Sequence, residues 1–141
     1  MQITNSLGKH QLVPLVFMQD NVADSQNAAA LYIAEVASAA GNAVIHYTMP
    51  FAGEVIGVSA NLSAAATTGT LTITPTIETA ATADPILAIT TLAYGSDTCR
   101  RGTAPFAKNA VIGAKITTAS WNGTSSDLVV TVWVLLTIEG I

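Results

Sequence analysis

The sequence is poor in charge. Charged side chains make up 10% of its 141 residues, against about 25% in an ordinary soluble domain. The balance is acidic, with five Lys and Arg against nine Asp and Glu and a formal net charge of −4. Because nucleic-acid phosphates are bound by clustered Lys and Arg, this composition argues against a nucleic-acid partner. A surface with so few charges associates readily, so we expect a homo-oligomer or other protein partners.

Cysteine and long apolar runs are also scarce. Cys99 is the single cysteine, so an intrachain disulfide is excluded. No apolar run approaches the ~18 residues of a membrane-spanning helix. The first residues do not form a secretory signal, which needs basic residues followed by an apolar stretch. We therefore expect no membrane partner.

The sequence lacks the motifs of known catalytic and metal sites. Pairs with the spacing His-x-His, Cys-x-x-Cys or Glu-x-x-His do not occur, which argues against zinc. The hydrolase motif Gly-x-Ser-x-Gly and a glycine-rich phosphate loop are missing too. Asp84, Asp97 and Asp127 stand alone in loops, which favours turn formation over calcium binding. We expect no enzyme, no cofactor and no metal.

What the sequence does contain is a pattern of short β-strands. Half of the residues are hydrophobic, enough for a packed core in one domain. In the segment 70–78, Leu71, Ile73 and Ile77 alternate with threonines, which is typical of a strand with one buried face. Similar runs recur between turn residues along the chain. The pattern predicts an all-β fold, an antiparallel sandwich resembling a jelly roll with about 7–9 strands.

One short phrase occurs twice. Residues 50–58 read PFAGEVIGV, and residues 105–114 read PFAKNAVIGA. Each copy is followed by a loop of small residues and then by a β-rich run. We expect one β-hairpin unit used twice, with Phe51 and Phe106 closing the end of the sandwich.

The beginning of the chain differs from the rest. Residues 1–11 are polar, and residues 1–27 as a whole cannot form a core of their own, so we predict an extended N-terminal arm over 1–27 and a single β-sandwich domain over residues 28–141. Pro14 interrupts an apolar run and restricts it to an edge strand or an extended segment. We expect this run to pack on a partner through the side chains Leu12, Val13, Leu15 and Phe17. Residues 28–40 fit a helix ended by Gly41 or a strand, and the β-pattern downstream favours a strand.

Two tryptophans complete the candidate partner interface. Trp121 lies in a polar loop, where it either anchors an interface or a sugar, or folds over the sandwich edge as a lid. Trp133 alternates with Val132 and Val134 in the last strand. If the valines face the core, Trp133 faces outward and is covered by a neighbouring molecule.

Two runs carry a resemblance. Residues 47–59, YTMPFAGEVIGVS, and residues 106–118, ahead of a turn that contains tryptophan, resemble the β-sandwich decoration (cement) proteins of tailed-bacteriophage capsids. The resemblance implies a structural protein of the virion, made in the host cytoplasm and placed on the outer capsid surface. It implies that the chain bridges and stabilises neighbouring major capsid proteins. An alternative is a carbohydrate- or receptor-binding module of a phage head fibre or tail.

Overall fold

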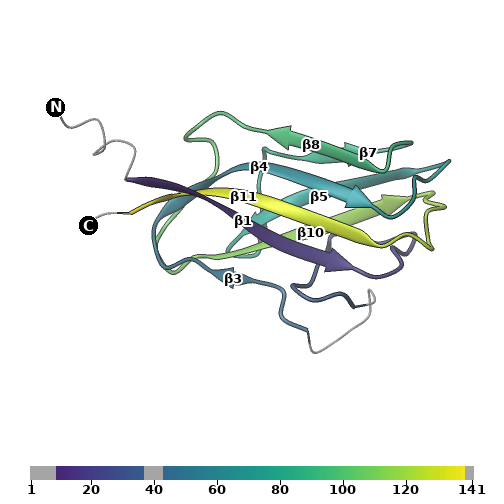
Figure 1. Cartoon of the computed structure of the whole chain (residues 1–141), viewed down its shortest axis with the longest axis horizontal. Coiled ribbons are helices and arrows are strands. Elements are labelled where there is room, and N and C mark those ends of the chain that lie inside the picture. The colour runs from purple at the N-terminus through teal and green to yellow at the C-terminus, as the bar shows by residue number, and fades with distance from the viewer. Residues whose placement is uncertain (1–8, 37–42, 139–141) are drawn as a thin grey trace.

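Alternating apolar and polar residues place one side of each long strand in a core between two sheets. The computed structural model describes residues 9–36 and 43–138. Eleven strand segments and no helix occur in these two stretches. The predicted antiparallel β-sandwich is confirmed, and Figure 1 shows one sheet in front of the other, with the long strands running along the molecule.

The layer nearer the viewer in Figure 1, the front sheet, has its strands in the order β1-β11-β4-β8. All its pairings are antiparallel, and a short strand, β9, pairs with the beginning of β4. The strands are β1 (His10–Gln19), β4 (Gly53–Leu62), β8 (Tyr94–Thr98), β9 (Pro105–Phe106) and β11 (Leu128–Thr137).

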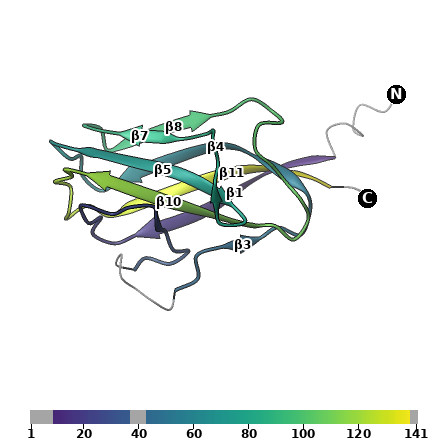
Figure 2. The ribbon, with the colours of Figure 1, turned by 180° about the vertical axis from the view of Figure 1, so that it is seen from behind.

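The other layer, the back sheet, has a core order β2-β10-β5-β6, and β3 and β7 pair with β10 and β5. It faces the viewer in Figure 2. Its strands are β2 (Ala29–Ala30), β3 (Tyr47–Thr48), β5 (Thr70–Ile77), β6 (Ala80–Ala81), β7 (Leu87–Ile89) and β10 (Val111–Ala119).

The connectivity repeats itself. Strands β1, β11, β4 and β8 of the front sheet correspond in position to β7, β5, β10 and β2 of the back sheet. The short strands follow the same rule, because β9 pairs with β4 as β3 pairs with β10. Exchanging β1–β5 with β7–β11 therefore reproduces the whole pairing scheme, and only β6 lacks a counterpart among the described strands. Eight strands in two such sheets give the connectivity of a jelly roll.

The repeated phrase marks equivalent places in these halves, but it does not form hairpins. The first copy leads into β4 and the second into β10, and each strand then crosses to the opposite sheet, to β5 and to β11. The pairs β4–β5 and β10–β11 are therefore arches, in which a loop of several residues spans the ~10 Å between the two packed sheets. The two turns meet: the Met49 N–H donates to the Ala110 carbonyl at 2.9 Å, and the Asn109 N–H donates to the Met49 carbonyl at 2.8 Å.

Residues 10–27 are not an arm. Strand β1 pairs with β11 over its full length, from His10–Thr137 to Gln19–Leu128. Leu15 and Phe17 are buried in the core because they alternate with outward residues on this strand. The boundary expected at residue 27 therefore does not separate an arm from the sandwich. Pro14 fits its predicted place, since β1 is an edge strand of the front sheet.

The ambiguous segment 28–40 is neither a helix nor a long strand where it is described. It contains only the two-residue strand β2 and an isolated bridge between Tyr32 and Met18. Leu31 is fully buried, and its N–H donates to the Ala114 carbonyl at 2.9 Å. Residues 37–40 lie outside the described residues.

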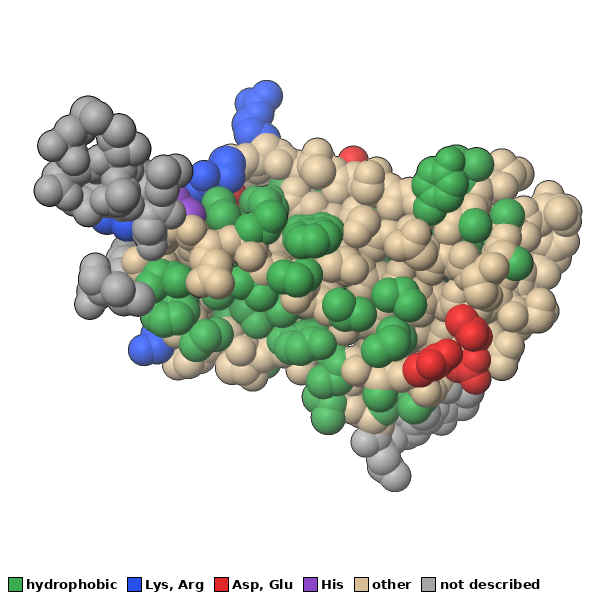
Figure 3. Space-filling model, viewed as in Figure 1, with side chains coloured by type: hydrophobic (Ala, Val, Ile, Leu, Met, Phe, Trp, Pro, Cys, Tyr) green, Lys and Arg blue, Asp and Glu red, His purple; other side chains and the backbone are tan. Residues whose placement is uncertain are grey.

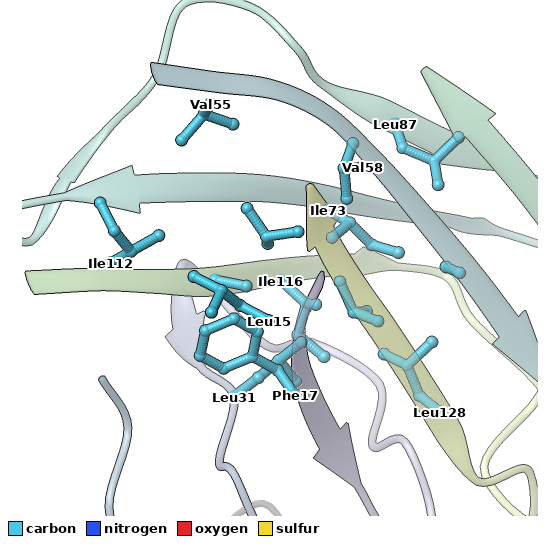
Figure 4. Packing of buried hydrophobic residues seen from close by; sticks show 14 of the residues in the cluster. Leu15, Phe17, Leu31, Val55, Val58, Ile73, Leu87, Ile112, Ile116 and Leu128 are labelled. Atoms are coloured by element: carbon cyan, nitrogen blue, oxygen red, sulfur yellow. The ribbon is translucent and has the colours of Figure 1, made fainter. Parts of the chain in front are cut away.

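The core joins side chains from both sheets. Figure 4 shows Phe17 and Leu15 of β1 beside Leu31, with Ile112 and Ile116 of β10 across the gap. The ring of Phe17 meets that of Tyr47 edge-on, with 5.4 Å between the centroids. Phe106 is buried and Phe51 packs against the same cluster, so both lie at the sandwich end as expected.

Candidate functional site

The outer face of the front sheet, which we call the front face, is the most unusual surface of the molecule. Cross-strand pairs place its residues in rows: Leu12 beside Leu135, Pro14 beside Trp133, and Met18 beside Val129. Between these rows, β1 and β11 turn only apolar side chains outward apart from Thr131, which pairs with Val16. Figure 3 shows the resulting hydrophobic area along the middle of this face.

Strand β4 and strand β8 continue the front face with small and polar residues. Gly57 pairs with Trp133 on one side and with Thr98 on the other, and Ser59 lies between Thr131 and Ser96. The charged residues of these two strands are Glu54, whose carboxylate binds Arg101 at 2.7 Å, and Asp97, whose Oδ2 accepts the Ile86 N–H at 3.1 Å. The front face therefore offers little that water solvates strongly.

Trp133 shapes a groove in the front face. Its Nε1 donates a hydrogen bond to Ser59 Oγ at 3.0 Å, so the indole lies across β4. Gly57 faces this side chain, and a Cβ there would lie 3.3 Å from the Asp97 carbonyl and 3.9 Å from Trp133 Cβ. The groove beside the indole has a volume of about 240 Å³ and is bordered by Leu12, Ile56 and Thr98. Leu12 is 52% exposed at its rim.

An acidic cluster stands at one end of the front face, where β1 ends and β11 begins. One carboxylate oxygen from each of Asp20, Glu35 and Asp127 lies within 4.8 Å of the other two. A hydrogen bond to Asp127 and burial raise the pKa of Asp20, and the charges of Asp127 and Glu35 act in the same direction. The hydrogen bond from Asp20, together with one from the Asn21 N–H at 3.1 Å, lowers the pKa of Asp127. When one of the two carboxyl groups is protonated, the proton is therefore favoured on Asp20 over Asp127.

Sequence reasoning missed this cluster. Asp127 is far from Asp20 and Glu35 along the chain, and only the pairing of β1 with β11 brings Asp127 beside Asp20. Their spacing along the sequence carries no signal. Three aspartates, Asp84, Asp97 and Asp127, were expected to form turns in loops. Asp97 instead lies in β8, where its Oδ2 accepts the Ile86 N–H, and Asp127 Oδ1 accepts the Asn21 N–H, both at 3.1 Å, so these two bonds join distant segments and are not local turns.

Basic residues gather at the opposite end, where β1 begins and β11 ends. Lys9 precedes β1, and its carbonyl accepts the Ile138 N–H at 2.7 Å. Lys108 borders an open hollow of about 490 Å³ together with Phe51 and Thr137. Arg100 and Arg101 follow β8 in an exposed turn, held by the Arg101–Glu54 ion pair. Figure 3 shows blue side chains at this end and red ones at the other.

The structure divides the predicted interface residues. Leu12 and Trp133 come together on the rim and wall of the same groove. Val13 is half-buried, whereas Leu15 and Phe17 lie in the core and are not available to a partner.

Trp121 is a lid and not an exposed anchor. Its side chain is 2% exposed. Gly123 makes this possible, because a Cβ at that position would lie 2.6 Å from the indole Cζ2. The Trp121 N–H of the backbone donates to Asp24 Oδ1 at 2.8 Å and fixes the turn.

Cys99 is held in an unreactive setting. Burial is the main cause that raises the pKa of the Cys99 thiol, and the charges of Asp84, Glu54 and Asp97 add to it. The Cys99 Sγ–H donates to the Val55 carbonyl at 3.3 Å. A thiol in this state is a poor nucleophile, because the thiolate is the reactive form.

The described residues contain no helix long and apolar enough to cross a lipid bilayer. A scan against models of known protein families finds no match for the chain, and a search of curated proteins finds none either.

Proposed function

We propose that this chain is a structural protein of a bacteriophage virion, which decorates and stabilises the outer capsid surface by bridging neighbouring major capsid proteins. The observation that carries the proposal is the front face. A sheet face whose outward residues on two adjacent strands are nearly all apolar marks an interaction surface, because monomeric soluble proteins rarely leave such areas open. The chain acts by burying this face against neighbouring subunits of the particle.

Two further properties support an outer-surface role. The net charge of −4 suits a position away from packaged nucleic acid. The jelly-roll connectivity is shared by viral capsid proteins and lectins, which is an analogy of fold and raises both classes equally. The front face then favours the first class, since it is built for protein burial.

The alternative, a carbohydrate-binding module, loses its main residue. Trp121 is buried and offers no platform for a sugar. Trp133 borders a groove, but the neighbouring Ser59 hydroxyl already accepts the indole N–H. Sugar sites need several convergent polar groups to orient the ligand. A glycan array is expected to give no binding.

The proposal is tested with purified phage particles that lack this protein. Added recombinant chain is expected to bind in many copies and to raise the melting temperature of the capsid, because a ligand of the assembled state stabilises it. Leu12→Arg places a charge on the exposed rim of the groove and is expected to abolish binding. Thr72→Arg, the matched change on the outer side of β5 in the back sheet, is expected to bind normally. The proposal is wrong if the protein is missing from purified virions or if both variants bind alike.

A further inference from the structure

The front face carries opposite charges at its two ends. The acidic cluster of Asp20, Glu35 and Asp127 lies at one end, and Lys9, Arg101 and Lys108 lie at the other. Strand β1 runs ten residues between them, a distance of about 30 Å. Because dissolved ions screen charges from each other beyond ~8 Å at physiological ionic strength, the two ends act as separate charged sites.

We propose that the front face is covered by a second copy of this chain, packed antiparallel and face to face. This inference rests on the proposed function: among the neighbouring subunits of the particle, it names a second copy of the chain as the one that covers the front face, so that the dimer bridges the capsid proteins. The two-fold axis lies within the interface and runs across the strands, so that it reverses the strand direction. The acidic cluster of each copy then stands opposite the basic end of the other, and the apolar rows of β1 and β11 meet in the middle.

Charge selects this arrangement over the other face-to-face dimer. An axis parallel to the strands would place the two acidic clusters opposite each other and the two basic ends opposite each other, so that like charges would repel at both ends. The antiparallel axis gains two attractive contacts from one surface, as an isologous interface requires. Like-charge juxtaposition at an interface suppresses the wrong register more than it changes affinity.

The edge of the front sheet disfavours a competing mode of association. Strand β1 is an edge strand, and edge strands can pair with another chain through free N–H and C=O groups. Pro14 removes an N–H from the middle of this edge. The bridge between Met18 and Tyr32 closes its far end. Association through the front face is therefore favoured over pairing of edge strands, and the area of this face is sufficient for a weak dimer.

A face of four strands and about ten residues measures roughly 30 by 20 Å. Burying it on both copies removes on the order of 1,200 Å² from water, the lower limit of a standard specific interface. We therefore expect a dimer that dissociates on dilution and whose stability depends on salt.

The test measures the mass of the full chain by sedimentation equilibrium at low and high ionic strength. The wild type is expected to be dimeric at low ionic strength and to dissociate more readily as salt is added. Leu12→Arg is expected to be monomeric, and Thr72→Arg on the back sheet is expected to dimerise normally. Circular dichroism and thermal unfolding confirm that both variants are folded.

Charge reversal tests the orientation. The variant Glu35→Lys with Asp20→Lys makes both ends basic, and the variant Lys9→Glu with Lys108→Glu makes both ends acidic. Each alone is expected to dimerise at least ten times more weakly than the wild type. A one-to-one mixture is expected to form a heterodimer, because each basic end then faces an acidic end. Combining all four changes in one chain is expected to restore the homodimer.

The outcomes separate this inference from the proposed function. A chain that stays monomeric at low ionic strength, yet binds particles through Leu12, overturns the dimer and leaves the function standing. A charge-selective dimer that never binds particles overturns the function and leaves the dimer standing. A dimer that ignores the reversals, or a mixture that forms no heterodimer, overturns the antiparallel arrangement.

Discussion

Strands β11 and β5 occupy equivalent positions in the two sheets and turn different residues outward. Trp133 of β11 pairs with Gly57 of β4, and its counterpart Thr76 of β5 pairs with Gly113 of β10. The inner residues of both strands are apolar and buried, as the shared core requires. The outer residues of β5 are the threonines at 70, 72, 74 and 76, of which Thr76 is buried, whereas β11 presents Val129, Trp133 and Leu135.

This difference separates what the fold needs from what the molecule does. Core packing constrains the inward side of both sheets alike. Nothing in the sandwich requires Trp133 or Leu12 to be apolar, because both are on the outside. The back sheet shows that the same connectivity is stable with threonines there. The apolar side chains of the front face therefore support the proposed interaction with another molecule.

The largest expected effect breaks the inward side of the front sheet. Phe17→Ala should lower the free energy of unfolding by about 3–5 kcal/mol, because it removes a fully buried ring from the core. Val16→Ala, on the outward side of the same strand, should cost less than about 1 kcal/mol. Urea denaturation measures both. Equal small losses would mean that β1 contributes little to the core.

The next effect compares the two copies of the repeated phrase. An alanine at Gly113 would place a Cβ 2.8 Å from Thr76 Oγ1 and 3.1 Å from the Ile45 carbonyl. Gly113→Ala should therefore cost about 1–3 kcal/mol through overpacking. At Gly57 the nearest atom is the Asp97 carbonyl at 3.3 Å, so Gly57→Ala should cost less than about 1 kcal/mol. Denaturation midpoints that rank the two variants in the opposite order would contradict this.

A smaller effect on folding comes from making the front face resemble the back one. Trp133→Thr copies the residue at the equivalent position of β5. We expect a loss of about 1–2 kcal/mol in stability, since the indole is only half-buried and its bond to Ser59 is lost. We expect a complete loss of self-association in sedimentation experiments. Association that survives this change would move the interface away from the front face.

The smallest effect concerns the charges at the end of the front face. The raised pKa of Asp20 means that this group stabilises the fold below its unfolded pKa and loses that contribution as pH rises through the folded pKa. Asp127, with its lowered pKa, does the opposite. Asp20→Asn keeps a donor for Asp127 and removes a repelling charge, so the melting temperature should rise at neutral pH. The gain should vanish in acid, where Asp20 is already protonated. An unchanged difference across the pH range would contradict the opposite pKa shifts of the two aspartates.

The sequence predicted the parts of the fold that local alternation determines. The threonines of β5 face outward, and Leu71 and Ile73 face inward, as their spacing indicates. Trp133 lies outside because Val132 and Val134 lie inside. Pro14 correctly indicated an edge strand. These predictions needed only the two-residue period of a strand.

Other features depend on partners far away along the chain. The segment around Phe17 reads as an arm because its core neighbours, such as Ile112 and Val130, are about a hundred residues distant. The polar loop around Trp121 suggests an exposed ring. The ring is buried because Gly123, which has no side chain, lets the indole lie directly against the loop backbone. The prediction of two hairpins was wrong, because a loop of small residues is compatible with a turn within one sheet and with an arch between two sheets.

The pairing of β1 with β11 also dictates the order in which the molecule can fold. His10 meets Thr137, so the earliest described strand finds its only long partner in the last one. During synthesis, β1 and β4 emerge from the ribosome well before β11, which lies between them in the finished sheet. The front sheet can close only after residue 137 has been made, and such non-local pairing folds slowly. Until then the apolar side chains of β1 need either chaperones or rapid completion of the chain.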